Sequence, residues 1–154
     1  MKKHYSHFCL IILFSLSFNI AKAQTWLPVG NGMEGGYVYS LNAYDSVLYA
    51  GGTFIGPGNH IAQWDGNNWS GVGSGINGNV YSMFHYKNLL YTGGWFTNAG
   101  GYSAGSLAQW NGSNWSAVSP GYLWNVVSSI DTFNNNMFAA SPHYGIIGWW
   151  NGKI

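Results

Sequence analysis

The feature that most limits how this chain can fold is an internal repeat. A segment that begins with tryptophan occurs three times, as WLPVG from Trp26, WSGVG from Trp69 and WSAVS from Trp115. Three further blocks recur in a fixed order: VYSL from Val38, VYSM from Val80 and VVSS from Val126; LYAGGTF from Leu48, LYTGGWF from Leu90 and MFAAS from Met137; IAQWDG from Ile61, LAQWNG from Leu107 and IGWWNG from Ile147. Self-similarity at a period of roughly 45 residues indicates a repeat architecture.

Each block predicts a short β-strand, because it is rich in Val, Tyr, Trp and Phe and is bounded by Gly, Asn, Asp or Ser. In the first copy we expect strands over 37–44, 47–54, 60–64 and 68–73, with the later copies in the same register. The dipeptides Asp65-Gly66, Asn111-Gly112 and Asn151-Gly152 favour tight hairpins between strands. The chain lacks helix signals, so we predict an all-β fold.

Four antiparallel strands in each repeat are typical of a β-propeller blade. We expect about three blades, over 37–73, 79–119 and 125–154, the last without its fourth strand, and a lone outer strand over 25–30. Propellers need typically 4 to 8 blades to close. Either further blades follow in a longer chain, or three blades pair with three from a second molecule. A free three-bladed arc is the least expected form, because its end blades would expose apolar faces.

The block pattern resembles the kelch repeat. Its second strand carries tyrosine and a glycine pair, its third strand an aromatic residue, and its fourth strand opens with tryptophan. The fuller pattern, LYxGGxF followed by IAxWxGxxW and VGxG, is similar to blades of large secreted bacterial propellers and of fungal cell-surface polarity markers. The resemblance implies a propeller fold. It implies little about function, because propellers include enzymes, lectins and scaffolds.

Two recurring residue types predict how the blades pack. The repeated tryptophans are expected in the core between blades: Trp26, Trp64, Trp69, Trp110, Trp115 and Trp150. The glycine pairs Gly51-Gly52 and Gly93-Gly94 lie inside predicted strands, where glycine marks a close approach of another segment.

The N-terminal residues predict export. Lys2 and Lys3 precede an apolar stretch from Phe8 to Phe18 and the small-residue ending Ala21-Lys22-Ala23, which is the layout of a secretory signal peptide over residues 1–23. The apolar stretch is shorter than the roughly 20 residues that span a bilayer. We expect cleavage before Gln24, a secreted or cell-surface location, and no transmembrane segment in the mature chain.

Charge and metal-ligand content exclude several functions. After residue 23 the chain has two lysines, Lys87 and Lys153, four carboxylates and no arginine, so it lacks the cations that nucleic-acid binding requires. The only cysteine, Cys9, lies in the expected signal peptide. The histidines at 60, 85 and 143 fall at different phases of the repeat. We therefore predict neither a metal site nor a cofactor.

The four carboxylates, Glu34, Asp45, Asp65 and Asp131, form no evident pair of the kind that glycosidases use. We therefore predict a non-enzymatic interaction module whose partner is a protein or a glycan. A lectin-like carbohydrate-binding propeller is the alternative. A fragment of a secreted hydrolase or lyase, with its active site outside this chain, is the third.

The predicted binding residues lie in connections that vary between the copies. Variable loops on a rigid frame are where binding residues concentrate. The variable connections are 55–59, 97–105 and 141–144, together with 74–79 and 120–125, which should share one face. Outside the repeat pattern they contain the candidate binding residues Trp124, Tyr102, His143 and Tyr144.

Overall fold

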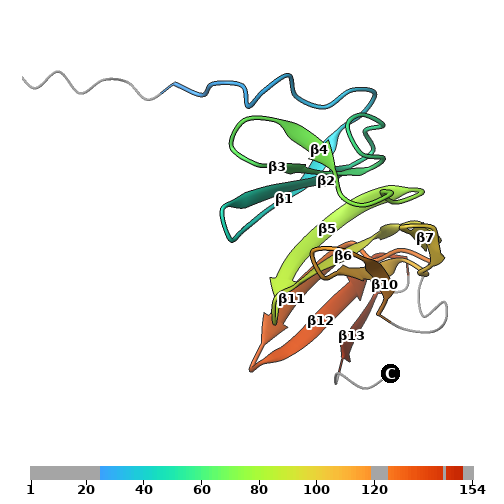
Figure 1. Ribbon diagram of the computed structural model, residues 1–154. Coiled ribbons are helices and arrows are strands. Elements are labelled where there is room, and N and C mark those ends of the chain that lie inside the picture. The colour runs from blue at the N-terminus through green and yellow to red at the C-terminus, as the bar shows by residue number, and fades with distance from the viewer. Residues whose placement is uncertain (1–24, 119–124, 144, 151–154) are drawn as a thin grey trace, which may run out of the picture.

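The computed structural model describes residues 25–118, 125–143 and 145–150. These residues form an all-β structure without a helix: two four-stranded antiparallel sheets, one three-stranded antiparallel sheet and a two-stranded hairpin (Figure 1). No helix in these ranges is therefore long and apolar enough to cross a membrane. The expected signal peptide and two predicted binding residues, Trp124 and Tyr144, lie outside the described residues.

The strands follow the repeat. The first sheet contains β1 (Val38–Tyr44), β2 (Val47–Gly52), β3 (Ile61–Trp64) and β4 (Trp69–Gly71), each paired with the next. The second contains β5 (Asn79–Tyr86), β6 (Leu89–Trp95), β9 (Leu107–Trp110) and β10 (Trp115–Ala117), and the third contains β11 (Ser129–Phe133), β12 (Asn136–Ser141) and β13 (Ile146–Trp150). The expected four-strand unit is confirmed for the first two copies.

Tight turns join these strands. Between the first two strands of each sheet, both turn residues have positive φ, as in a type I′ hairpin: Asp45-Ser46, Lys87-Asn88 and Asn134-Asn135. Between β3 and β4, Asp65 Oδ1 accepts the backbone N–H groups of Asn67 and Asn68, both at 2.8 Å. The N–H groups of Asn68 and Asn67 also hold the pKa of Asp65 below its ordinary value. Asn111 Oδ1 accepts the equivalent bonds in the second sheet. The Asp65 carboxylate therefore stabilises the turn.

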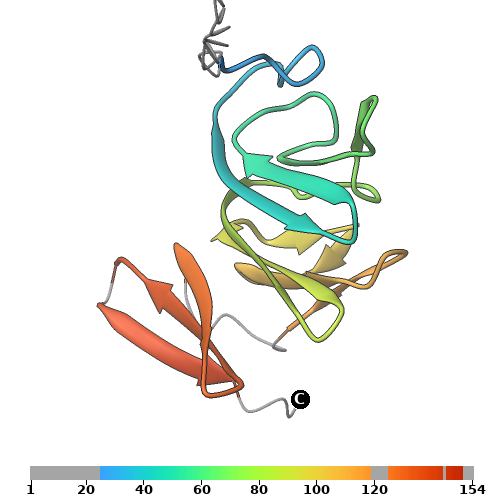
Figure 2. The same cartoon turned by 90° about the vertical axis from the view of Figure 1, so that its left-hand side faces the viewer.

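The sheets pack one on the next through their first strands. β5 lies against β1 on one side and against β11 on the other. One core, between the first and second sheets, includes Tyr49, Ile61, Val80 and Met83, and another lies between the second and third sheets. The segment before β1 and the strand β13 lie at opposite ends of this row of sheets in both views (Figures 1 and 2).

Hydrogen bonds between sheets repeat with the sequence. The Met83 N–H donates to Ser40 Oγ and the Ile130 N–H donates to Ser82 Oγ, both at 3.0 Å. Between the fourth strands, the Trp115 indole Nε1 donates to the backbone oxygen of Val72 at 3.0 Å. The two serine bonds are equivalent, because each joins the serine of one sheet to the residue after the corresponding serine of the next sheet.

The predicted close approach at the glycine pairs is confirmed. A Cβ atom on Gly51 would lie 2.4 Å from Cγ1 of Val80, and one on Gly93 would lie 2.5 Å from Cγ1 of Val127. Both distances are shorter than a carbon–carbon contact allows, so a side chain at either position would push the next sheet away. The third sheet has Ala140 at this position.

The expected register of the third copy is wrong by one residue. The repeat pattern aligns Val126 with Val80 as equivalent residues. In the structure, however, Val127 makes the contact with Gly93 that Val80 makes with Gly51. The Ser82–Ile130 hydrogen bond agrees, because it makes Ser129 the equivalent of Ser82. Two adjacent valines gave the same local pattern, and the contact with the second sheet decides between them.

The expected burial of the repeated tryptophans is correct for part of the set. Trp110 and Trp115 are buried, and Trp64, Trp69 and Trp150 are partly buried. Trp26 is fully exposed, so its assignment to the core is wrong in this structure. Trp26 has the repeat position of Trp69 and Trp115, but no third strand lies beside it among the described residues.

Candidate functional site

A cleft of about 800 Å³ lies where the three sheets come together. Tyr39 of β1, Tyr81 of β5 and Trp95 at the end of β6 form one part of its wall. The remaining wall comes from the segment before β11 and the turn after β12, through Asn125, Val126, Ser128, Pro142 and His143. All three repeats therefore contribute to one concave surface.

Aromatic rings form a continuous row into this cleft. The Tyr39 and Tyr81 ring centroids are 5.6 Å apart with the planes tilted by 51°, and Tyr37 stacks on Tyr39 at 6.3 Å. Asn79 Nδ2 donates to the Tyr81 hydroxyl at 3.1 Å, which fixes that ring. Tyr39 and Trp95 are more than half exposed. Much of the surface of these two side chains is therefore available to a ligand.

The chemistry of the cleft is aromatic and neutral. The described residues of its lining include no Lys, Arg, Asp or Glu, and its polar groups are the tyrosine hydroxyls, the Trp95 indole N–H, Asn125, Ser128 and His143. Aromatic side chains combine a large apolar surface with a polar tip, and their few rotatable bonds limit the entropy lost on binding. The arrangement can stack against a ring or an apolar face and hydrogen-bond the edge of a neutral ligand.

The structure brings one predicted binding residue into the cleft. His143 lines it, whereas Tyr102 lies in the hairpin formed by β7 (Asn98–Ala99) and β8 (Tyr102–Ser103) and is not part of the lining. Asn77 holds this hairpin: its Oδ1 accepts the N–H groups of Thr97 and Asn98 at 2.9 and 2.8 Å. The connections 74–79 and 97–105 thus share one face, as expected.

Sequence reasoning missed the three residues that contribute most of the aromatic surface. Tyr39 and Tyr81 occupy one repeat position, where the repeat pattern predicts strand residues only. Trp95 stands where the other copies have Thr53 and Pro142. That departure from the repeat was the available signal, because a residue that differs between copies cannot be explained by the shared architecture.

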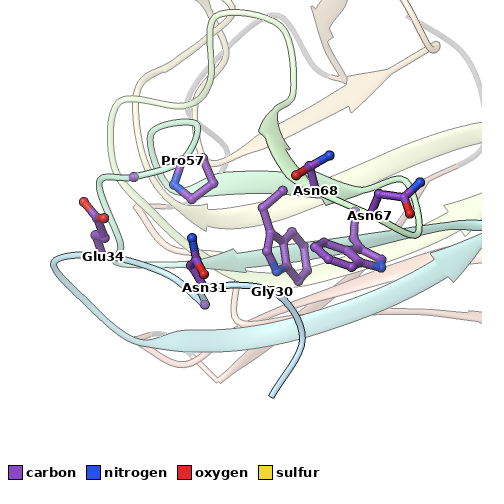
Figure 3. A pocket seen from close by; sticks show the side chains of 10 residues that line it. Gly30, Asn31, Glu34, Pro57, Asn67 and Asn68 are labelled. Carbon is purple, nitrogen blue, oxygen red and sulfur yellow. The ribbon is translucent and has the colours of Figure 1, made fainter. Parts of the chain in front are cut away.

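A second, smaller hollow of about 390 Å³ lies beside the first sheet, and Figure 3 shows Glu34 and Asn31 on one side of it and Asn67 and Asn68 on the other. Trp64 and Trp69 also line it, with ring centroids 5.5 Å apart. The pair Trp110 and Trp115 repeats this geometry at 5.3 Å in the second sheet. The indoles of this hollow therefore belong to the architecture of the repeat, and the larger cleft is the better candidate.

Metal binding has no visible site in the described ranges, since they contain no group of three or more His, Cys, Asp or Glu side chains that could hold an ion.

Comparison with known proteins gives a likeness of fold alone. No protein-family model and no curated protein matches the chain. Among solved structures, the computationally designed Ika4 protein matches with a TM-score of 0.50 and 14% sequence identity, over 73% of this chain and 64% of that chain. The computationally designed Ika8 protein matches with a TM-score of 0.33 and 13% identity, over 77% of this chain and 48% of that one. The chain thus spans less than two thirds of the length of either protein.

Proposed function

We propose that this chain is part of an exported, kelch-like β-propeller that acts as a non-catalytic interaction module, and that it binds its partner in the aromatic cleft. The observation that carries the proposal is the convergence of Tyr39, Tyr81 and Trp95 from two sheets on one neutral cleft that the third sheet completes. A surface with several exposed aromatic rings and no charge suits recognition better than it suits proton transfer.

The propeller architecture is supported by the way the sheets succeed one another. Successive antiparallel sheets pack through their first strands, and the Ser40–Met83 and Ser82–Ile130 hydrogen bonds repeat the same contact. If this arrangement continues around an axis, the first strands line the centre. The aromatic cleft would then lie at the mouth of the central channel.

A non-catalytic role is supported by where the carboxylates lie. Asp65 is engaged by two backbone N–H groups of its own turn, and Asp45 is a turn residue with positive φ. Glu34 lines the smaller hollow, and none of the four carboxylates lines the aromatic cleft. The cleft therefore lacks the acid and base pair of a glycoside hydrolase.

A lectin-like function is the second candidate, and the polar groups beside the rings favour it. Asn125 and Ser128 lie in the same lining as Tyr39 and Tyr81. A neutral sugar presents an apolar face that stacks on aromatic rings and an edge of hydroxyl groups that needs such donors and acceptors. An apolar peptide would use the rings and leave these polar groups without partners.

Binding to a glycan array, followed by titration of tryptophan fluorescence with neutral oligosaccharides that score on it, tests the lectin-like candidate and the assignment of the cleft as the binding site. Trp95→Ala and Tyr39→Ala should each weaken binding about tenfold or more, as expected for aromatic contact residues. Tyr102→Ala is the matched control, since Tyr102 is equally exposed but lies outside the cleft. Loss of binding in Tyr102→Ala alone would place the site on the hairpin. An array without neutral glycans among its hits would argue against the lectin-like candidate.

A further inference from the structure

Among the described residues, Trp26 and Trp150 each lack the indole partner that the equivalent tryptophans have in the first two sheets. In the first two sheets a third-strand indole pairs with a fourth-strand indole: Trp64 with Trp69 at 5.5 Å and Trp110 with Trp115 at 5.3 Å. Trp150 of β13 has the third-strand position, but no fourth strand pairs with β13 among the described residues. Trp26 has the fourth-strand position and is fully exposed.

The segment 26–30 is held in the manner of a fourth strand. The Trp69 Nε1 donates to the backbone oxygen of Val29 at 3.0 Å, as Trp115 does to Val72. A Cβ atom on Gly30 would lie 2.7 Å from Cζ3 of Trp64, and one on Gly73 would lie 2.9 Å from Cζ3 of Trp110. The segment therefore packs on the sheet that follows it as the residues at the end of β4 do, but no third strand lies beside it among the described residues.

The outer faces of the first and third sheets expose apolar residues whose equivalents are buried between sheets. Met83 and Ile130 are each 5% exposed, whereas Leu41, at the same position of the first sheet, is 61% exposed. On the third sheet, Ile147 is 74% exposed, whereas its equivalent Ile61 is 0% exposed. The residues that bury one another between the first and second sheets are thus uncovered at the two ends.

We propose that two copies of this chain associate head to tail, so that the segment 26–30 of one copy pairs with the free edge of β13 in the other. Leu41 would then lie on the face that carries Ile147, and Trp26 would pair with Trp150 of the other copy. A single molecule cannot make this contact, because the two ends lie far apart in both views (Figures 1 and 2). Two such contacts close a ring with three sheets from each copy, within the roughly 4 to 8 blades of closed propellers.

The proposed contact between copies differs at two positions from the contacts between successive sheets within one copy. Ala140 replaces Gly51 and Gly93, so the neighbouring sheet must lie further from β12. Phe133 stands at the position of Tyr44, whose hydroxyl donates to Asn88 Oδ1 of the next sheet at 2.8 Å. Phe133 cannot donate this bond. The contact between copies is therefore weaker than the internal ones, and the association should be reversible on dilution.

Sedimentation of the purified chain, with residues 24–154 intact, tests the proposal. The chain should sediment as two copies and dissociate to one on dilution. Trp26→Ala should raise the concentration of half-dissociation about tenfold or more, as for a central aromatic contact. Because Trp26 is fully exposed within one copy, this change should leave folding intact. Trp95→Ala, which removes an exposed indole from the cleft, should have no effect. A chain that stays single at all concentrations, that forms larger species without a two-copy form, or that responds equally to both changes would overturn the proposal.

Disulfide trapping gives an independent readout that locates the contact. In the chain of residues 24–154, which contains no cysteine, a Leu41→Cys protein mixed with a Ser129→Cys protein should form a disulfide between copies, because the Ser40–Met83 and Ser82–Ile130 bonds join these two repeat positions between successive sheets. Ser40→Cys with Met83→Cys in one chain is the positive control and should cross-link within the molecule. Cross-linking of this control without cross-linking of the mixture would overturn the proposed interface.

Discussion

The second and third sheets contain the same repeat, but only the second sheet is covered on both faces. Leu107 of the second sheet is partly buried in the core that it shares with the third, whereas Ile147, its equivalent, is mostly exposed. Trp110 is buried next to β10, whereas Trp150 has no strand beyond it in the described ranges. The comparison teaches that burial at a repeat position is decided by the neighbouring strand or sheet and not by the residue or its local sequence.

The strongest test of this comparison removes a buried indole from the second sheet. Trp115→Ala should reduce the free energy of unfolding by about 3 to 5 kcal/mol, because it leaves a cavity and removes the hydrogen bond to Val72. Trp149→Ala, at an exposed position of the third sheet, should change it by less than about 0.5 kcal/mol. Urea denaturation followed by circular dichroism measures both. Equal losses would contradict the distinction between a covered and an uncovered sheet.

A smaller effect is expected where the sheets approach one another. Gly93→Ala should reduce the free energy of unfolding by about 1 to 3 kcal/mol, because the new methyl group would overlap Val127. Ala140→Gly at the equivalent position of the third sheet should cost only about 0.5 to 1 kcal/mol, the usual cost of glycine within a strand. Thermal denaturation of both variants is the measurement. A Gly93→Ala protein as stable as the wild type would mean that the second and third sheets can separate without loss.

The smallest effect is a pH dependence of the joint between the first two sheets. The His85 ring stacks on Tyr44 with centroids 4.3 Å apart and lies 5.3 Å from Tyr49, and burial lowers the pKa of His85. The unfolded chain therefore takes up a proton at a higher pH than the folded chain does. The stability that neutral His85 contributes is complete above about pH 6.5 and is lost as the pH falls from there toward the folded-state pKa.

His85→Gln should remove this part of the pH dependence, whereas His143→Gln, at an exposed position, should keep it. The measurement is the melting temperature between pH 8 and pH 5. Parallel curves for the wild type and His85→Gln would show that the joint does not depend on the protonation of this ring.

The positions of the strands could be predicted from the sequence, whereas the contacts between sheets could not. Val, Tyr and Trp in short blocks between turn residues predicted β1 to β6 closely, because alternation and turn chemistry are local. The register at Val126 could not be predicted because it depends on contacts with the second sheet, and the exposure of Trp26 could not be predicted because local sequence does not tell whether a third strand lies beside it. The same holds for the cleft. Strand patterns do not tell which sheet edges converge, so Tyr39 and Tyr81 were not distinguishable from core residues.

The bond from each fourth-strand indole to the carbonyl of the preceding repeat bears on how such a chain can change length during evolution. Trp69 donates to Val29 and Trp115 donates to Val72, so the first repeat carries both a donor and an acceptor of this type of contact. Duplication of one whole repeat therefore inserts a unit that fits both of its neighbours without any further substitution. Loss of part of a repeat breaks the joints on both sides at once. Gene duplications in whole repeats are consequently the steps along which a family with this joint can grow or shrink.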